Sequence, residues 1–139
     1  MRQIVSDAKL AGRVTIDSAG THNYHPGEPP DARSQHHAKL RGYDLSALRA
    51  RALTDDDIER FDLLVVMDEA NYSAVVQRAE KQHRHKVQRL TEFCESDSGK
   101  RFCEVPDPYY GERADFERVL DLVEDGCAGL LARVRATLG

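Results

Sequence analysis

Apolar residues recur three and four positions apart in the last segment of the chain, which is the pattern of one face of an amphipathic helix. The stripe consists of Phe116, Val119, Leu120, Val123, Cys127, Leu130, Leu131 and Val134. The same spacing in residues 1–11 predicts a helix that ends at Gly12, since glycine readily adopts the left-handed conformation that stops a helix.

Three further helices are predicted between these two. Residues 31–40 precede Gly42, which can end a helix. Residues 54–60 begin with the Thr-x-x-Asp spacing of a capping box, so a short helix is expected there. Asp68 can cap another helix that starts directly after it.

Three segments have the pattern of strands. Residues 63–67 are an apolar run between charged residues, which is typical of a strand covered on both faces in a parallel sheet. Residues 87–90 predict a second buried strand, and the alternation of apolar and polar positions in residues 13–18 predicts a third. Strands that alternate with helices indicate an α/β domain with a parallel sheet. Residues 92–108 predict a long loop, and such loops are often functional.

Length and composition narrow the class of protein. The 139 residues, 32% of them charged, suit one domain that spans residues 1–139. A net charge of −4 lacks the basic bias of a nucleic-acid-binding domain, so no nucleic-acid partner is expected. The apolar runs are far shorter than the roughly 20 residues of a membrane helix, so we expect a cytoplasmic protein without a membrane partner. Three cysteines without an export signal indicate reduced thiols, and the six histidines lack zinc-site spacing, so no metal or other cofactor is expected.

Four motifs follow one another along the chain. They are Asp17-Ser18-Ala19-Gly20-Thr21, Phe61-Asp62, Met67-Asp68-Glu69-Ala70-Asn71 and Val105-Pro106-Asp107-Pro108-Tyr109-Tyr110. In order and spacing they resemble the low-molecular-weight protein tyrosine phosphatase family, and the resemblance covers nearly the whole chain. It implies three layers, α/β/α, around a parallel sheet. It also implies hydrolysis of phosphotyrosine in proteins, or of small aryl phosphates, through a cysteinyl-phosphate intermediate.

The resemblance assigns roles to individual residues. Asp107 would be the general acid that protonates the leaving phenolate and later activates water. An aromatic wall beside the phosphorylated ring would consist of Tyr109, Tyr110 and Tyr24. Hydrogen bonds and ion pairs that support the phosphate loop are expected from Ser18, Arg51, Asp68 and Asn71. For the last two, helix capping is a sufficient explanation by itself.

The sequence also departs from the family pattern. In the family a first strand leads into a phosphate-binding loop of Cys, five residues and Arg, which precedes a helix that residues 1–11 resemble. We therefore expect an N-terminally truncated member that lacks its nucleophile loop and is inactive as given. Cys127 and Arg133 have the Cys-x5-Arg spacing but lie in a predicted helix, and Cys94 follows no matching buried strand. Leu48 stands where many members have histidine.

Loss of a strand inside the sheet predicts exposed strand edges between residues 13–18 and 63–67, with low stability and self-association as consequences. Two other functions stay open. One is a non-catalytic binding or oligomerisation module of the same fold. The other is an arsenate reductase of the same fold, for which Cys94 and Cys103 are candidate thiols, although the Asp-Pro-Tyr-Tyr motif at Asp107 favours the phosphatase.

Overall fold

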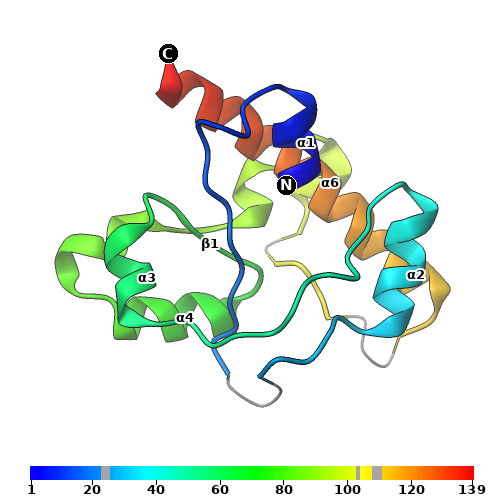
Figure 1. The fold of residues 1–139 in the computed structure, drawn as a ribbon, viewed down its shortest axis with the longest axis horizontal. Helices are drawn as coiled ribbons and strands as arrows, with labels where there is room; N and C mark the ends of the chain where they lie inside the picture. Colours follow the sequence, from blue (N-terminus) through cyan, green and yellow to red (C-terminus); the bar gives the residue numbers. More distant parts are fainter. Residues whose placement is uncertain (23–25, 103, 108–110) are drawn as a thin grey trace.

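The computed structural model describes residues 1–22, 26–102, 104–107 and 111–139, apart from the side chain of Ser98. The described helices are α1 (Arg2–Asp7), α2 (Ala32–Leu40), α3 (Asp55–Arg60), α4 (Glu69–Arg78), α5 (Asp97–Lys100) and α6 (Arg113–Leu138), with the 3-10 helices η1 (Lys81–Lys86) and η2 (Leu90–Phe93). The strands β1 (Leu64–Val66) and β2 (Val87–Arg89) pair in parallel. Figure 1 shows α1 and α2 lying along α6, with α3 and α4 grouped at the opposite end of the molecule. The chain is an α/β domain with a parallel sheet, as its sequence predicts.

Side chains that alternate along β1 divide the core into two parts. Leu63 and Val65 pack against the apolar cluster that joins η2 to α6. Leu64 and Val66 belong to a second cluster, between β2 and α4. Because successive side chains of a strand point to opposite faces, both faces of β1 are covered, and this explains why residues 63–67 are apolar without interruption.

Two glycines allow η2 to lie directly on α6. A Cβ atom added at Gly129 would stand 1.7 Å from the carbonyl oxygen of Phe93, and one at Gly126 would stand 2.7 Å from a side-chain carbon of Leu90. Both distances are far below van der Waals contact, so any side chain at these positions would push the two elements apart. Leu90 is 2% exposed, so this contact lies at the centre of the larger cluster.

The predicted helix signals around the sheet are confirmed. Asp31 caps α2, which ends just before Gly42 with its φ of 89°. Thr54 and Asp57 form the capping box of α3. The carboxylate of Asp68 accepts the backbone N–H of the third residue of α4. Short polar side chains therefore fix the start of α2 and α3, which precede β1, and of α4, which lies between β1 and β2.

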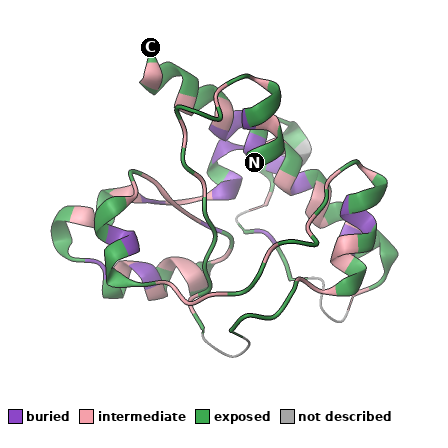
Figure 2. Cartoon of the chain, in the orientation of Figure 1, coloured by how far each residue is buried: buried purple, intermediate pink, exposed green. Residues whose placement is uncertain are grey.

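The strand predicted at residues 13–18 is wrong. Val14 and Ile16 are half-buried and alternate with exposed neighbours, so the segment is extended along the molecule (Figure 2). Within the described part of the chain it joins no sheet, and the nearest pairing is an isolated parallel bridge between Gly20 and Ala52. Alternation predicts which face is buried, but a strand also needs a neighbour at hydrogen-bonding distance.

Two other boundaries differ from the sequence prediction. Helix α1 ends at Asp7, and Lys9, rather than Gly12, has a left-handed φ of 61°. The long loop predicted at residues 92–108 contains the end of η2 and all of α5. The hydroxyl of Ser96 accepts the N–H of Gly99, so a local side-chain hydrogen bond turns this segment into helix.

Candidate functional site

The segment that carries Asp107 is fixed at the carboxyl end of β1. The N–H of Val105 donates to the carbonyl oxygen of Met67 at 2.7 Å, and the Val105 side chain is buried. The carboxylate of Glu104 accepts the N–H of Glu69 at 2.8 Å, at the start of α4. Asp107 lies two residues beyond these contacts and is exposed. The predicted acid therefore extends from an anchored stretch of backbone at the strand end.

Asp68 and Asn71 lie at the same end of β1, and each side chain makes a hydrogen bond that stabilises the fold there. Asp68 Oδ1 accepts the N–H of Asn71 at 2.7 Å, which is the capping role that the sequence already suggested. The amide Nδ2 of Asn71 donates to the hydroxyl of Thr21 at 3.2 Å. This second bond ties the start of α4 to the end of the extended segment. Thr21 belongs to a predicted motif, but no signal in the sequence pairs it with Asn71.

Arg51 contacts the extended segment of residues 13–18 through Asp17. Its guanidinium donates to both carboxylate oxygens of Asp57, at 2.8 and 3.2 Å, and lies 3.1 Å from a carboxylate oxygen of Asp17. The bond from Arg51 and the one from Thr54 keep the pKa of Asp57 at about 2, although burial of the carboxyl opposes this. The guanidinium is therefore engaged by two carboxylates of this chain.

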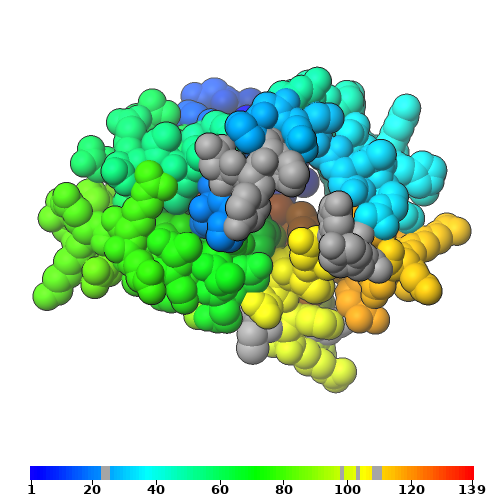
Figure 3. Space-filling model, turned by 90° about the horizontal axis from the view of Figure 1, so that it is seen from below, coloured from blue at the N-terminus to red at the C-terminus, as the bar shows by residue number. Residues whose placement is uncertain are grey.

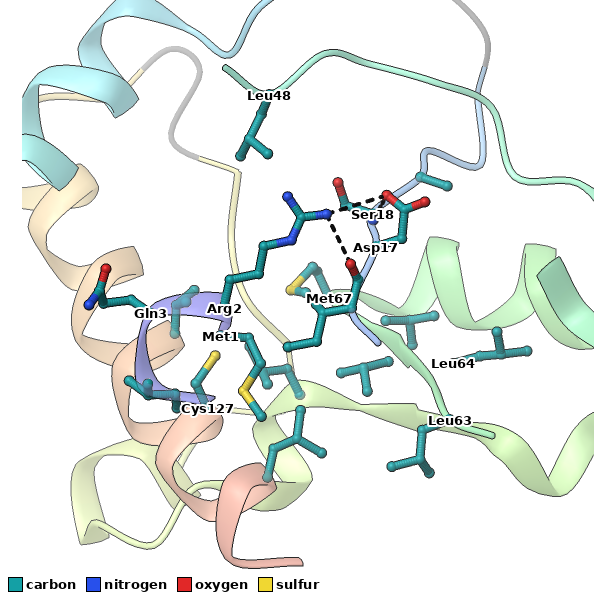
Figure 4. A pocket seen from close by; sticks show the side chains of 18 of the residues that line it. Met1, Arg2, Gln3, Asp17, Ser18, Leu48, Leu63, Leu64, Met67 and Cys127 are labelled. Atoms are coloured by element: carbon teal, nitrogen blue, oxygen red, sulfur yellow. Dashed lines mark hydrogen bonds and ion pairs between the residues drawn. The ribbon is translucent and has the colours of Figure 1, made fainter. Parts of the chain in front are cut away.

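A cavity of about 2000 Å³ opens beside these residues. Ser18, Arg51 and Asn71 are among the residues that line it, whereas Asp68 and Asp107 are not. Figure 4 shows Asp17 and Ser18 on one side, Leu63, Leu64 and Met67 on the other, and the side chain of Arg2 projecting between them. In the view from below, the surface is hollowed and α6 is visible at the bottom of the hollow (Figure 3).

The structure brings part of the predicted site together. Ser18, Arg51 and Asn71 share the cavity, and Asp68 contacts Asn71 directly. The predicted aromatic wall of Tyr24, Tyr109 and Tyr110 lies outside the described residues, so it stays a prediction. Leu48, the expected departure from histidine, also lines the cavity.

The two described cysteines are buried and have no features of a nucleophile. Cys94 is 5% exposed and Cys127 is 8% exposed. Burial and the nearby carboxylate of Asp125 raise the pKa of the Cys94 thiol to about 11. Because the thiolate is the reactive form, a raised pKa suppresses attack on an electrophile. Cys127 lies inside α6, and Cys103 is outside the described residues.

In the described part of the chain, no group of three or more His, Cys, Asp or Glu side chains is arranged to hold a metal ion. None of the helices described has the length and apolar character needed to cross a membrane.

Comparison with known proteins settles the family. The model of the family described as "Low molecular weight phosphotyrosine protein phosphatase" matches residues 1–138. The chain belongs to the low molecular weight phosphotyrosine protein phosphatase family. Its chicken relative, named as such a phosphatase, is 34% identical over 95% of this chain and 82% of its own length. The corresponding Streptomyces coelicolor protein is 38% identical over 96% and 81%.

Solved phosphatases share the fold as well as the sequence. A protein tyrosine phosphatase from Entamoeba histolytica superimposes with a TM-score of 0.92 and 32% identity, over 99% of this chain and 86% of that one. YfkJ from Bacillus subtilis gives a TM-score of 0.87 at 31% identity, over 98% and 82%. These relatives carry phosphatase names, which favours the phosphatase over the arsenate reductase considered above.

Proposed function

We propose that the carboxyl end of β1 is a site for phosphotyrosine in proteins or for small aryl phosphates, with Asp107 as the general acid. The observation that carries this proposal is the hydrogen bond from Val105 to Met67, which holds the acidic segment where β1 ends. Ligands of open α/β sheets bind beyond the carboxyl ends of the strands, and this general rule supports the proposal that Asp107 acts on a bound substrate there. The chemistry needs no metal or other cofactor.

The proposed roles follow from this position. The Asp107 carboxyl group donates its proton to the phenolate oxygen as the bond to phosphorus breaks, and the carboxylate then takes a proton from the attacking water. Tyr24, Tyr109 and Tyr110 form the aromatic wall for the ring. The hydrogen bonds of Arg51 and Asn71 support the strand end rather than the reacting phosphate, because their side chains already have partners within the chain.

The proposed reaction also needs a cysteine nucleophile. Phosphoryl transfer to sulfur needs a thiolate exposed to substrate, and neither Cys94 nor Cys127 meets that condition. We infer that the polypeptide of 139 residues does not hydrolyse aryl phosphates by itself. Its acid and its substrate-facing loops would act together with a phosphate-binding loop that carries the cysteine.

Hydrolysis of p-nitrophenyl phosphate by the purified chain tests this inference. We expect the rate to equal that of the buffer, and to be unchanged in the Cys94→Ser and Cys127→Ser variants. Turnover that disappears in either variant would contradict the inference. Turnover that disappears only in a Cys103→Ser variant would contradict it too, and would identify that cysteine as the nucleophile.

A further inference from the structure

Glu104 lies beside the start of α4, three residues before the proposed acid. Its carboxylate Oε2 accepts the N–H of Glu69 at 2.8 Å. This N–H belongs to the first residue of α4, and the first N–H groups of a helix have no partner within the helix. Asp68 accepts a different one, that of Asn71, so two carboxylates share the positive end of this helix. Glu104 directly precedes the motif that begins at Val105 and has no role in that motif.

Glu104 and Val105 attach the acidic segment at two points. Beside the bond of Glu104, the N–H of Val105 donates to the carbonyl oxygen of Met67 at 2.7 Å. The segment therefore runs alongside the turn by which β1 passes into α4. A single hydrogen bond leaves the backbone free to pivot about it, whereas two bonds from adjacent residues also fix its direction. Pro106 follows with its restricted φ, so the two bonds also determine the direction in which the chain reaches Asp107.

The residue to which Glu104 is bonded is itself held in place. The carboxylate of Glu69 accepts hydrogen bonds from Nε and Nη2 of Arg89, the second at 2.9 Å. The central carbon of the Arg89 guanidinium lies 4.1 Å from the centre of the Tyr72 ring, about one turn further along α4. A two-point carboxylate pair and a cation–π contact together orient a guanidinium. The start of α4 is therefore fixed to the end of β2, and Glu104 is bonded to a rigid part of the fold.

We propose that Glu104 is the positioning residue for the general acid: its bond to Glu69 holds the Asp107 carboxyl group within reach of the leaving oxygen. This rests on the proposed function, since it requires that Asp107 donates the proton. Proton transfer needs the two oxygens within about 2.6–3.2 Å, and a misplacement of about 1 Å costs about 100-fold in rate. Glu104 is exposed and bonds to one N–H, so its contribution to global stability is small. The position of the acid depends on Glu104 more than the fold does.

The first test uses a chimera in which a first strand and a Cys-x5-Arg loop of the family pattern are joined to Met1. The quantity measured is kcat/KM, which reports on transfer of the phosphoryl group from the substrate. Glu104→Ala should lower it at least about tenfold for phenyl phosphate, whose leaving group needs a proton, and less than about threefold for p-nitrophenyl phosphate. Glu104→Gln should restore it to within about threefold, because the amide oxygen accepts the same N–H.

A control and a double variant separate positioning from folding. Glu95→Ala should change neither rate, because Glu95 is exposed and its side chain makes no hydrogen bond within the described residues. In the Asp107→Asn background, Glu104→Ala should cause no further loss with phenyl phosphate, because Glu104 acts only through Asp107. A merely structural role would add its own loss there and would reduce turnover of both substrates equally. The melting temperature of Glu104→Ala should lie within about 3 °C of the native value.

The second test uses the 139-residue chain and needs no catalysis. Nitrogen-15 relaxation gives the order parameter of the Asp107 N–H, and amide hydrogen exchange reports on the bond of Val105. We expect an order parameter near the roughly 0.85 of rigid backbone in the native chain and in Glu104→Gln, and below about 0.6 in Glu104→Ala. Exchange at Val105 should be faster in Glu104→Ala than in the other two.

Three results would overturn the proposal. A selective loss with phenyl phosphate in Asp107→Asn but not in Glu104→Ala would confirm the acid and show that Glu104 does not position it. Absence of a selective loss in Asp107→Asn would overturn the proposed function, and the role of Glu104 with it. An unchanged order parameter of Asp107 in Glu104→Ala would overturn the proposal by itself, even if the chimera turned over neither substrate.

Discussion

Replacement of Asp57 by asparagine tests the network that holds the strand end. Asp57 is buried and accepts two bonds from Arg51 and one, at 2.9 Å, from the backbone of Thr54. The fall of its pKa from 3.8 to about 2 corresponds to about 2 kcal/mol of native-state stability. Because the Arg51 side chain is 36% exposed, solvent screening reduces this figure, and we expect a loss of about 1–2 kcal/mol at neutral pH.

The same shift sets the direction of the pH dependence. A carboxyl whose pKa is lower in the folded state stabilises the protein above its unfolded pKa of about 4, and this contribution is lost as the pH falls toward 2. Urea unfolding followed by circular dichroism from pH 7 down to pH 2.5 measures it. The unfolding free energy of the native chain should decline more steeply across this range than that of the Asp57→Asn variant.

A neighbouring carboxylate provides the matched control. Asp56 lies on the same helix, its side chain is 71% exposed, and its contact with Arg60 measures 3.8 Å. Asp56→Asn should change the unfolding free energy by less than about 0.5 kcal/mol and leave the pH dependence intact. If Asp57→Asn and Asp56→Asn behaved alike, the Arg51 network would not stabilise the fold and the reasoning would be refuted.

Three more predictions follow from single contacts. Gly129→Ala should lower the free energy of unfolding in urea by at least about 2 kcal/mol, since its Cβ would stand 1.7 Å from the Phe93 carbonyl oxygen. Gly12→Ala is the control and should be nearly neutral, because no atom lies within 4 Å of the added Cβ. Similar losses in the two variants would contradict the packing of α6 against Phe93. Asp68→Ala should lower stability by about 1 kcal/mol through loss of the cap of α4, and an unchanged melting temperature would disprove that role. The Cys94 thiol should react with a thiol reagent only as fast as the protein opens, because it is buried and its pKa is about 11; fast labelling of folded protein would show it to be accessible.

Local signals explain how much of the fold could be predicted from the sequence. The two residues of a capping box are only three positions apart in the sequence, so Thr54 and Asp57 correctly predicted the start of α3. The continuous apolar run of residues 63–67 likewise predicted a strand covered on both faces. The strand prediction for residues 13–18 is wrong because strand pairing depends on a partner that is distant in the sequence. The alternation of apolar and polar side chains carries no information about that partner.

In the candidate site, too, the local features could be predicted from the sequence, whereas the contacts between distant residues could not. The resemblance gave Asp68, Asn71 and Arg51 supporting roles around the phosphate loop. The structure brings Asp68 and Asn71 together at the start of α4 and pairs Arg51 with Asp57 and Asp17. The partners of Arg51 were not foreseen, because Asp17 and Asp57 come from a different segment and from a helix cap. Two carboxylates bind the Arg51 guanidinium, and only the tertiary fold determines which carboxylates these are, while its support of a phosphate loop stays a prediction.

The most direct test of the central claim, that Asp107 is the general acid, places the acid and a phosphate-binding loop in one polypeptide. A first strand and a Cys-x5-Arg loop of the family pattern are joined to Met1, and kcat is measured with phenyl phosphate and p-nitrophenyl phosphate. The chimera should turn over both substrates. Asp107→Asn should lower kcat about 10²- to 10⁴-fold for phenyl phosphate, whose leaving group needs a proton, and much less for p-nitrophenyl phosphate. Equal losses on both substrates, or no loss on either, would contradict the assignment.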